Sequence, residues 1–466
     1  MSDPTRPTTP PGVSLRRWLA HLAETDRLVA ADGKALRFEV AACAKAVERE
    51  KAVLFRKPDG HPVPVVANLF AARGWIAEAM GVSEADLTER FLAASEAPIP
   101  SRTIEDAPLR EVMVTTDIDL NAALPIPTHN EHDSGPYVTA GLLIVRDPET
   151  GAQNVSIHRC QITGPDRIGI LLLPRHAYRL HKQAEEAGAA LPVAIVIGAD
   201  PLTILASQAI APMGQDELEI AGALHGAPLE VVRCQTSDIE VPANAEIVIE
   251  GRLLSNIREP EGPFGEFPQY YGPRSDSQVV EVTALTHRRH PIFHTITGGN
   301  LEHLLLGGIP REATLLSHLR RSFPGVQAVH LPIGGVCRYH LVVQLSKRGE
   351  GEAKNVILGA FAGHYDIKQV TVVDPDVDPF DADAVAWAVA TRFQADRDLV
   401  RIDHAQGSKL DPSAREGVSA KLGFDATAPL DADEMAYKRI HVPGMESVDR
   451  TALLAATVAA SAIGGS

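Results

Sequence analysis

Cysteine is scarce in this sequence of 466 residues. Its four cysteines, Cys43, Cys160, Cys234 and Cys337, lie far apart and form no CxxC pair. This spacing argues against a zinc ribbon, a redox motif and a scaffold held by disulfides. We interpret them as small buried residues of a protein in a reducing compartment.

Long apolar runs are also missing. Candidates such as Val193–Gly198 have the length of a strand, whereas a transmembrane helix needs about 20 apolar residues. The first twelve residues, MSDPTRPTTPPG, are polar and rich in proline, without the apolar segment of a secretory signal. The sequence therefore predicts a cytoplasmic protein with no membrane partner.

Positive charge is in deficit, because 44 Lys and Arg residues stand against 60 Asp and Glu residues. A protein that follows a nucleic-acid backbone or an anionic membrane needs the opposite balance, so we expect neither as a partner. An acidic protein that binds an anion must gather its cations locally, which makes single Arg, Lys and His positions informative.

The length indicates two or three domains. Residues 1–103 mix helical and strand-like patterns and predict a small α/β domain. Residues 104–307 hold many short Val-, Ile- and Thr-rich runs, which indicate a β-barrel-like domain. Residues 308–466 alternate helices and strands, as in a second α/β domain. Residues 448–462 are predicted to form a helix that docks on its own body or on a partner.

The central domain has a predicted series of short elements. Its strands are Thr139–Val145, Asn154–Cys160, Ile168–Leu173, Val193–Gly198, Glu230–Cys234, Glu246–Leu253 and Gln278–Leu285, and its helices are His176–Ala187 and Asp216–Leu224. In the C-terminal domain we predict helices Glu312–Arg321, Ala353–Gly363 and Ala384–Phe393 and strands Val326–Leu331, Tyr339–Gln344 and Gln369–Val373.

The first candidate site is the segment Asn154-Val-Ser-Ile-His-Arg159 on a predicted strand. Asn and Ser offer oxygens, and Arg159 offers a permanent charge with a planar fork of donors. Residues five apart point to opposite faces of a regular strand, so a shared site needs a bulge or a ligand that wraps the strand end. On spacing alone, an outward-facing arginine and a polar edge residue are the simpler interpretation.

His176 and Glu217 each lie at the start of a predicted helix. His176 follows Pro174 in a first turn, where backbone N–H groups attract phosphate, although a single histidine there is more often a cap or a surface residue. Glu217 shares a helical stripe with apolar residues, so it either binds a cation or reaches water at the rim. With Asn154 these side chains suit Mn²⁺ or Mg²⁺ completed by phosphate oxygens, and they do not suit structural zinc.

The segment Glu259-Pro-Glu-Gly-Pro-Phe-Gly-Glu-Phe-Pro carries three glutamates in a loop stiffened by proline. Its glycines allow close backbone approach to a ligand. Two nearby carboxylates beside an arginine leave one ionised and the other available as a proton donor. We therefore favour an acid–base role for Glu261 and Glu266 over a solvated acidic turn.

These motifs resemble the UbiD-type decarboxylases, which use prenylated FMN, in order and spacing from about Pro100 to Ala428. The segments that carry the resemblance are Asn154-x-Ser-Ile-x-Arg159, Glu261-Gly-Pro-Phe-Gly-Glu266, Val373-Asp-Pro-Asp-Val-Asp378, Cys234-Gln-Thr, Val241-Pro-Ala, Glu246-Ile-Val-Ile-Glu-Gly251, Trp387, Arg392 and Leu410-Asp-Pro412. Gln235 departs from relatives that carry glutamate there.

The resemblance implies an N-terminal α/β domain, a flavin-reductase-like split barrel and a C-terminal α/β domain that dimerises. It implies a catalytic network of Arg159, Glu261 and Glu266, and Mn²⁺ held by Asn154, His176 and Glu217 against the flavin phosphate. A potassium ion is a further candidate. The cofactor-binding residues implied are Asn154, Ser156, Ile157, His158, Arg159, Arg175, His176, Glu217 and Lys368. A flavin prenyltransferase would supply the cofactor, and the chain is expected to form a homodimer or a higher homo-oligomer.

Three further residues are candidates for the substrate: His303, Arg311 and Arg338. An arginine fork and a histidine can hold a second carboxylate or a heteroatom. Their spacing resembles the pattern in the 2,5-furandicarboxylate decarboxylases within the family, which implies reversible conversion of this acid to 2-furoate and CO₂. The alternative is that Arg311 pairs with Glu312 or caps a helix, while Arg338 faces solvent.

Other functions stay open at this point. The substrate could be another aromatic acid, such as pyrrole-2-carboxylate or a hydroxybenzoate. A flavin oxidoreductase on a split barrel and a non-enzymatic flavin- or metal-binding module are the other classes, and neither needs the glutamate loop.

Overall fold

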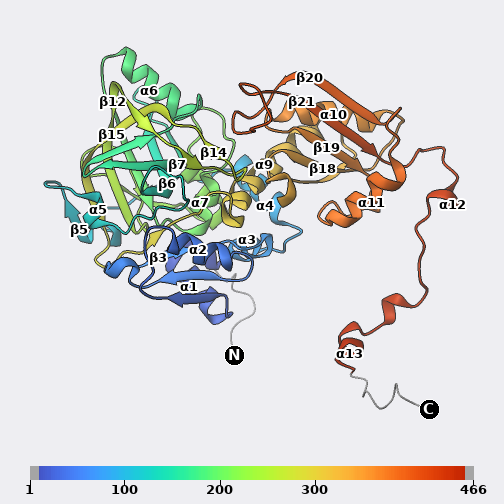
Figure 1. Cartoon of the computed structure of the whole chain (residues 1–466), viewed down its shortest axis with the longest axis horizontal. Coiled ribbons are helices and arrows are strands. Elements are labelled where there is room, and N and C mark those ends of the chain that lie inside the picture. The colour runs from blue at the N-terminus through green and yellow to red at the C-terminus, as the bar shows by residue number, and fades with distance from the viewer. Residues whose placement is uncertain (1–9, 457–466) are drawn as a thin grey trace.

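The computed structural model of the chain describes residues 10–456. Within them, an N-terminal α/β region, a central β-barrel and a C-terminal α/β region follow one another along the chain (Figure 1). Helix α9 (Leu301–Ser322) lies between the barrel and the C-terminal sheet. This is the mixed α/β and β architecture that the sequence predicts.

The N-terminal region is a four-stranded sheet with helices. Its strands, in sheet order, are β1 (Leu28–Ala31), β2 (Ala52–Phe55), β3 (Val65–Ala67) and β16 (Phe293–His294), and its helices are α1 (Leu15–Glu24), α2 (Glu39–Ala46), α3 (Arg73–Met80) and α4 (Leu87–Glu96). Strand β16 comes from the end of the central segment and pairs in parallel with β3. The N-terminal sheet is therefore completed by residues distant in sequence.

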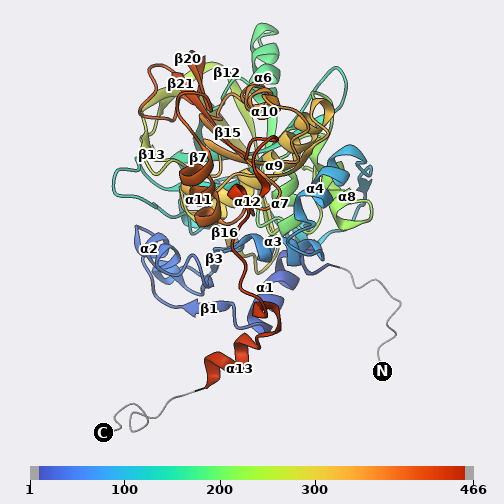
Figure 2. The ribbon, with the colours of Figure 1, turned by 90° about the vertical axis from the view of Figure 1, so that its right-hand side faces the viewer.

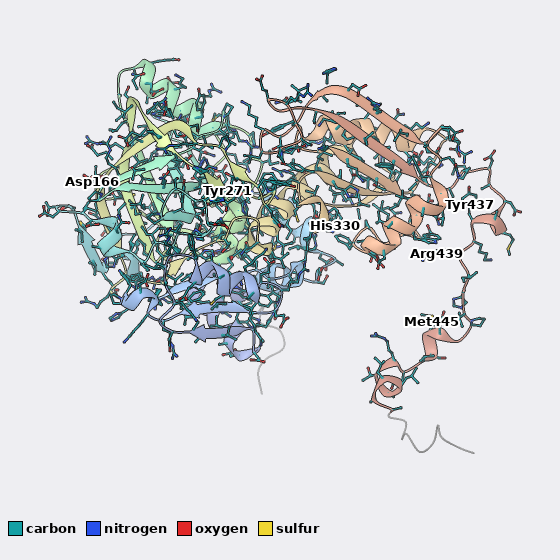
Figure 3. The ribbon with its side chains drawn as sticks, viewed as in Figure 1. Asp166, Tyr271, His330, Tyr437, Arg439 and Met445 are labelled. Atoms are coloured by element: carbon teal, nitrogen blue, oxygen red, sulfur yellow. The ribbon has the colours of Figure 1, made fainter. Side chains whose placement is uncertain are left out.

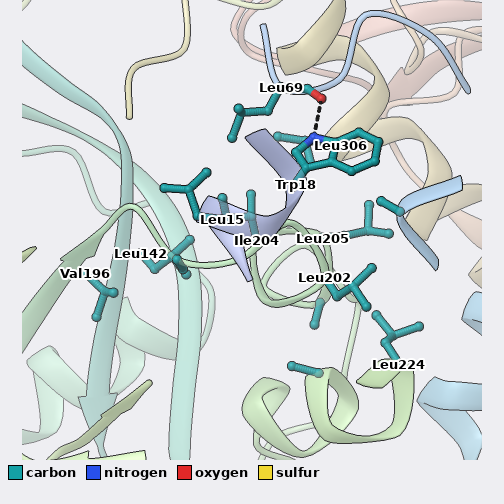
Figure 4. Close-up of a cluster of buried hydrophobic side chains, with 14 of the residues drawn as sticks. Leu15, Trp18, Leu69, Leu142, Val196, Leu202, Ile204, Leu205, Leu224 and Leu306 are labelled. Carbon is teal, nitrogen blue, oxygen red and sulfur yellow. Dashed lines mark hydrogen bonds between the residues drawn. The ribbon is translucent and has the colours of Figure 1, made fainter. Parts of the chain in front are cut away.

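One apolar core joins this region to the barrel (Figure 4). Trp18 of α1 is fully buried, and its indole N–H donates to the carbonyl of Leu69 at 3.0 Å. The same cluster contains Leu142 and Val196 of the barrel strands and Leu306 of α9. Because burial of apolar surface is the main stabilising force, this shared core fixes the two regions together.

The central sheet closes into a barrel of six antiparallel strands. In order these are β12 (Ile247–Glu261), β9 (Leu191–Ile197), β6 (Tyr137–Arg146), β7 (Gln153–Gly164), β8 (Arg167–Ile170) and β15 (Ser275–His287), and β12 pairs with β15. Strand β5 (Val112–Val114) extends β15 at one side. Two short helices, α5 (Leu120–Ala123) and α7 (Pro201–Ala206), lie in the same segment of the chain. A separate sheet contains β4 (Arg102–Thr103), β10 (Glu230–Arg233) and β11 (Glu240–Pro242). Strands β13 (Phe264–Gly265) and β14 (Tyr271–Gly272) form a hairpin. The predicted helices are present as α6 (His176–Glu186) and α8 (Glu217–His225).

A bulge interrupts the pairing of β6 with β7. Val138 pairs with Cys160 and Gly141 pairs with His158, so two residues of β6 lie opposite Arg159 alone. Bulges of this kind redirect side chains beside active sites. The bulge lies in β6, opposite Arg159, and not in β7, the strand that carries both Asn154 and Arg159.

The C-terminal sheet has the order β17 (Val326–His330), β18 (His340–Leu345), β19 (Gln369–Val373), β21 (Val418–Ala426) and β20 (Leu399–Gln406), with helices α10 (Glu352–Gly363) and α11 (Ala382–Arg392). The sequence does not predict strands β20 and β21. Strand β20 has no fully buried residue, so its sequence carries little of the hydrophobic pattern by which a strand is recognised.

Helix α9 is much longer than the predicted helix Glu312–Arg321, and the predicted domain boundary at residue 307 falls inside it. Gly307, Gly308 and Pro310 are poor helix formers, but most of the helix is buried, and packing overrides local propensity. The N-terminal region contacts α9 along its length, through Glu48 at the Leu301 N–H, Arg73 at Glu312 and Glu89 at Arg320.

The C-terminal tail extends away from the rest of the molecule (Figures 1 and 2). It carries the short helices α12 (Glu434–Tyr437) and α13 (Arg450–Ala455), and Tyr437, Arg439 and Met445 lie along it in Figure 3. Leu453 and Leu454 are 65% and 70% exposed. For the described part of the tail, docking on its own body is thus wrong, and docking on a partner stays a prediction. Residues 457–462 of the predicted helix lie outside the described residues.

The four cysteines are free, and each is buried or half-buried. Among residues 10–456, no helix is both long enough and apolar enough to cross a membrane.

Candidate active site

Arg159 of β7 joins the two glutamates of the loop. Its Nε and Nη2 atoms donate to the two carboxylate oxygens of Glu261 at 2.9 and 2.7 Å, and Nη1 donates to Glu266. Glu261 has no exposed surface, and the Arg159 side chain is 9% exposed. A buried bidentate pair of this kind holds both partners in a fixed geometry.

Neighbouring side chains hold the loop in place. The Tyr137 hydroxyl donates to Glu261 at 3.0 Å, and the Gly262 N–H donates to Gln161 at 3.1 Å. The Gly265 N–H donates to Asp133 at 2.8 Å. These contacts come from strands β6 and β7 and from the segment before β6. The barrel therefore fixes the loop at Glu261, Gly262 and Gly265.

Glu266 differs from Glu261 in its hydrogen-bonding. Glu261 accepts two N–H groups of Arg159 and the hydroxyl of Tyr137, whereas Glu266 accepts one N–H of Arg159. Burial raises the pKa of Glu266 above its ordinary value, against the lowering effect of Arg159. A carboxyl with a raised pKa keeps its proton to higher pH, so Glu266 is suited to proton donation. The third glutamate, Glu259, is half-exposed and pairs with Arg167 at 2.6 Å, outside this group.

Asn154, His176 and Glu217 also lie together. The Asn154 amide nitrogen is 3.0 Å from Glu217 Oε1 and 3.5 Å from His176 Nδ1, and the Val155 N–H donates to Glu217 Oε2 at 2.7 Å. Glu217 is 3% exposed, so it does not reach water at a rim. Helix α6 begins at His176, and Pro174 therefore precedes the helix instead of lying in its first turn.

The donor chemistry of this group fits a hard divalent cation. Burial raises the pKa of Glu217 to about 8, a cost that a bound cation removes. Burial and the charges of Arg175 and Arg179 lower the pKa of His176, which keeps its ring neutral, the form that binds metals. Among the described residues, no three His, Cys, Asp or Glu side chains gather as metal ligands. A cation here would accordingly rely on the Asn154 amide and on oxygens from a ligand.

Ser156, Ile157 and His158 are half-buried on β7 between the two groups. His158 Nδ1 lies 3.3 Å from the Leu171 carbonyl, which can only accept, so Nδ1 carries the proton. His158 Nε2 then accepts from the Ser156 hydroxyl at 3.0 Å. Burial lowers the pKa of His158 to about 4, and the strand presents neutral polar groups here.

Arg175 and Lys368 make other contacts. Arg175 is exposed and donates through Nη2 to the Tyr365 hydroxyl of the C-terminal region at 3.0 Å. The Lys368 ammonium lies 2.7 Å from Asp411 and 2.6 Å from the Ser413 hydroxyl. Their cofactor contacts remain predictions.

His303 and Arg338 meet around Phe267, the residue after Glu266. The Arg338 guanidinium lies 5.2 Å from the Phe267 ring centre, and the rings of His303 and Phe267 are 6.3 Å apart. Arg338 is 7% exposed and donates to the carbonyls of Leu304 and Cys337. The interpretation of Arg338 as a solvent-facing residue is therefore wrong.

His303 is neutral, unlike the two arginines beside which it was placed as a substrate-binding candidate. Burial and the charge of Arg338 lower its pKa to about 3. The Gly299 N–H donates to Nδ1 at 3.2 Å, so the ring proton lies on Nε2. His303 can thus offer a ligand a neutral hydrogen bond.

Arg311 is buried and only partly paired. Its Nη2 lies 3.5 Å from Asp366, while Nε and Nη1 have no hydrogen-bond partner within the described part of the chain. The neighbouring Glu312 bonds instead to Arg73 at 2.6 Å and to His330 at 2.9 Å, so pairing of Arg311 with Glu312 is excluded. Buried donors without partners are costly and mark a place for an anionic ligand.

Sequence reasoning missed three residues of this arrangement: Tyr137, Phe267 and Asp366. Phe267 could have been found, because it directly follows Glu266 in the stiff loop. Tyr137 and Asp366 come from distant segments and carry no local signal.

Comparison with known proteins identifies the family. Three family profiles match the chain in succession, all described under 3-octaprenyl-4-hydroxybenzoate carboxy-lyase: the N-terminal domain at residues 19–95, the Rift-related domain at 102–301 and the C-terminal domain at 304–426. This chain belongs to the UbiD family. It is therefore a carboxy-lyase, as its resemblance to this family implies.

Solved UbiD structures share the fold across almost the whole chain. The UbiD-class enzyme HmfF from Pelotomaculum thermopropionicum, in complex with FMN, is 50% identical with a TM-score of 0.92, over 94% of this chain and 99% of that one. An evolved dimeric form of HmfF in complex with prFMN is 47% identical with a TM-score of 0.89, over 95% and 100%.

Curated UbiD relatives are named as decarboxylases of different acids. Anhydromevalonate phosphate decarboxylase from Methanothermobacter thermautotrophicus is 38% identical over 90% of this chain and 98% of that protein. Gallate decarboxylase from Lactiplantibacillus plantarum is 32% identical over 82% and 84%. The reaction class is thus common to these relatives, while the substrates differ.

Proposed function

We propose that this UbiD enzyme removes CO₂ from 2,5-furandicarboxylate to give 2-furoate, reversibly and without net oxidation, using prenylated FMN and Mn²⁺. The observation that carries the substrate assignment is a pair of buried arginines: Arg338 lies against Phe267, one residue from Glu266, and Arg311 is close enough to Arg338 for their charges to repel. A site with two buried guanidinium groups near the proton donor suits an acid with a second anionic group.

The cofactor assignment rests on two observations. HmfF structures contain FMN or prFMN, and this chain gathers Asn154, His176 and Glu217 into a set of oxygen and nitrogen donors that fits a cation completed by phosphate. Bound prenylated FMN supplies an electrophilic centre that accepts the electrons left when CO₂ departs. A flavin prenyltransferase would provide this cofactor, and a potassium ion is a further candidate ligand.

The residues of the chain then have distinct tasks. Arg159 orients the departing carboxylate and holds Glu261 in place through two hydrogen bonds. Glu266 delivers a proton to the ring carbon that has lost CO₂, so that a C–H bond replaces the C–C bond. Arg311, Arg338 and His303 hold the remote carboxylate, which is retained in the product.

The test is the substrate dependence of an Arg311→Ala variant. The holoenzyme, co-expressed with a flavin prenyltransferase, is assayed for CO₂ release from 2,5-furandicarboxylate and from pyrrole-2-carboxylate. We expect kcat/KM to fall by about 10- to 100-fold for the dicarboxylate, since a charged hydrogen bond contributes about 1.5–3 kcal/mol. The monocarboxylate should lose far less, because its carboxylate is the reacting group. Equal losses for both acids would discard the second-carboxylate assignment.

The same screen distinguishes the alternatives. Preferred turnover of pyrrole-2-carboxylate or a hydroxybenzoate would leave the decarboxylase class intact and replace the substrate. A phosphorylated acid is included because relatives act on anhydromevalonate phosphate, and phosphate also suits paired arginines. A flavin oxidoreductase is less consistent with the Arg159–Glu261–Glu266 network, and NADH oxidation would reveal it.

We also propose that the chain is a homodimer or a higher homo-oligomer. The exposed apolar residues of the tail support this, because a partner that covered them would remove apolar surface from water. They are Leu430, Met435, Ile440, Val442, Met445, Val448, Leu453 and Leu454.

A further inference from the structure

The segment 364–367 of the C-terminal region reaches both sides of the site. Its Tyr365 hydroxyl accepts from Arg175, which precedes His176 at the start of α6, and its Asp366 faces Arg311 of α9. The ammonium of Lys421, which is 4% exposed, donates to the backbone carbonyls of Tyr365 and Ile367 at 2.8 and 2.7 Å. Lys421 therefore fixes the backbone of this segment through two hydrogen bonds.

Asp366 is a buried carboxylate among cations. It is 7% exposed, and its Oδ2 lies 3.5 Å from Arg311 Nη2. Arg338 and Lys421 also interact with it electrostatically. Burial and the repulsion of Arg338 lower the pKa of Arg311 to about 9, and Asp366 opposes this effect. Asp366 thus helps to keep Arg311 charged in a buried site.

The contact between Asp366 and Arg311 leaves hydrogen-bond donors of Arg311 available for a ligand. A separation of 3.5 Å is longer than the usual charged hydrogen bond, so Asp366 offsets the charge of Arg311 without a close bond. Among the described residues, Nε and Nη1 of Arg311 stay unpartnered. A ligand carboxylate on these donors would lie near Asp366, and two like charges at such a distance repel each other.

We propose that Asp366 sets the specificity and the product affinity of this site by competing with the ligand's remote carboxylate for Arg311. This inference rests on the proposed function. The remote carboxylate is present in both substrate and product, since only the other carboxylate leaves as CO₂. Two buried arginines without a counter-charge would retain 2-furoate, whereas repulsion from Asp366 favours its release.

The experiment compares Asp366→Asn, which removes the charge at nearly constant shape, with the wild-type holoenzyme. We expect the inhibition constant for 2-furoate to fall by about tenfold. The KM for the dicarboxylate should fall with it. Product release should slow, measured as a burst of CO₂ followed by a lower steady rate. A purely structural role would weaken the binding of both ligands, so tighter product binding separates the two explanations.

Three further variants complete the test. Asp366→Glu keeps the charge and should retain the wild-type inhibition constant. Tyr365→Phe alters the same segment without changing its charge and should leave 2-furoate binding unchanged. Asp366→Ser also removes the charge and carries the same expectation if the Asn variant fails to fold.

The outcomes separate this inference from the proposed function. If Arg311→Ala weakens binding of the dicarboxylate while Asp366→Asn does not tighten binding of the product, only the role of Asp366 is overturned. If Arg311→Ala changes neither ligand, the dicarboxylate assignment itself fails.

Discussion

Gly307 of α9 is where Arg338 packs against the helix, and adding a single methyl group there should displace the guanidinium. A Cβ atom at Gly307 would lie 1.5 Å from Nη2, 2.3 Å from Cζ and 2.8 Å from Nη1 of Arg338. To reach van der Waals distance, the guanidinium must move by roughly 2 Å. This movement breaks its bonds to the carbonyls of Leu304 and Cys337, now 3.2 and 3.0 Å long.

The expected loss from Gly307→Ala follows from the contact that Arg338 would make with substrate. A hydrogen bond to a charged group contributes about 1.5–3 kcal/mol. This amounts to a rise of about 10- to 100-fold in the Kd for the dicarboxylate. Global stability should change much less. Alanine gains about 1 kcal/mol over glycine in a helix, against an overpacking cost of about 1–3 kcal/mol.

Isothermal titration with the dicarboxylate measures this loss, and thermal unfolding checks the fold. Gly334→Ala is the matched control, because no atom of the described chain lies within 4 Å of the Cβ position there. An unchanged Kd in a folded Gly307→Ala variant would refute the assignment of Arg338 to the substrate.

The remaining predictions concern the acid, the anchor and the tail. Glu266→Gln should abolish CO₂ release while flavin absorbance stays, and an active variant would overturn the role of Glu266. Because burial raises the pKa of Glu266, the acid form persists above the usual glutamate range, and kcat should fall on the alkaline side of the pH profile; a loss on the acid side alone would contradict this. His176→Ala should lose both manganese, measured by elemental analysis, and flavin; full flavin retention would refute the anchor. Truncation after Ala428 should lower the oligomeric state in light scattering, and an unchanged mass would remove the tail from the interface.

The sequence predicts strands well where they carry the pattern of buried apolar residues. In the C-terminal sheet, strand β19 (Gln369–Val373) has its predicted bounds, and in the barrel the residues of β9 (Leu191–Ile197) are buried with one exception. Strand β20 lacks buried residues and was not predicted. Helix α9 contains Gly307, Gly308 and Pro310, which locally signal a break, and only tertiary packing reveals that the helix continues.

The candidate site was predictable where its residues belong to recognisable motifs. The glutamate loop and the segment around Arg159 are far apart in sequence, and they come together as the resemblance to the family implies. The neutral state of His303 and the position of Asp366 depend on burial and on partners from other segments, which no spacing encodes. Gln235, the departure from the family pattern, has an exposed side chain, and its backbone N–H donates to Glu250 at 2.9 Å.

The N-terminal region supplies none of the candidate site residues, yet it contacts α9 at its start, middle and end through Glu48, Arg73 and Glu89. Substrate specificity in this enzyme therefore depends on the N-terminal region as well as on helix α9, which carries His303 and Arg311. A chimera that receives α9 from a relative without the matching N-terminal region would lose these three contacts and shift the helix. Changes of substrate preference, in the laboratory or in evolution, should accordingly include compensating substitutions in the first hundred residues.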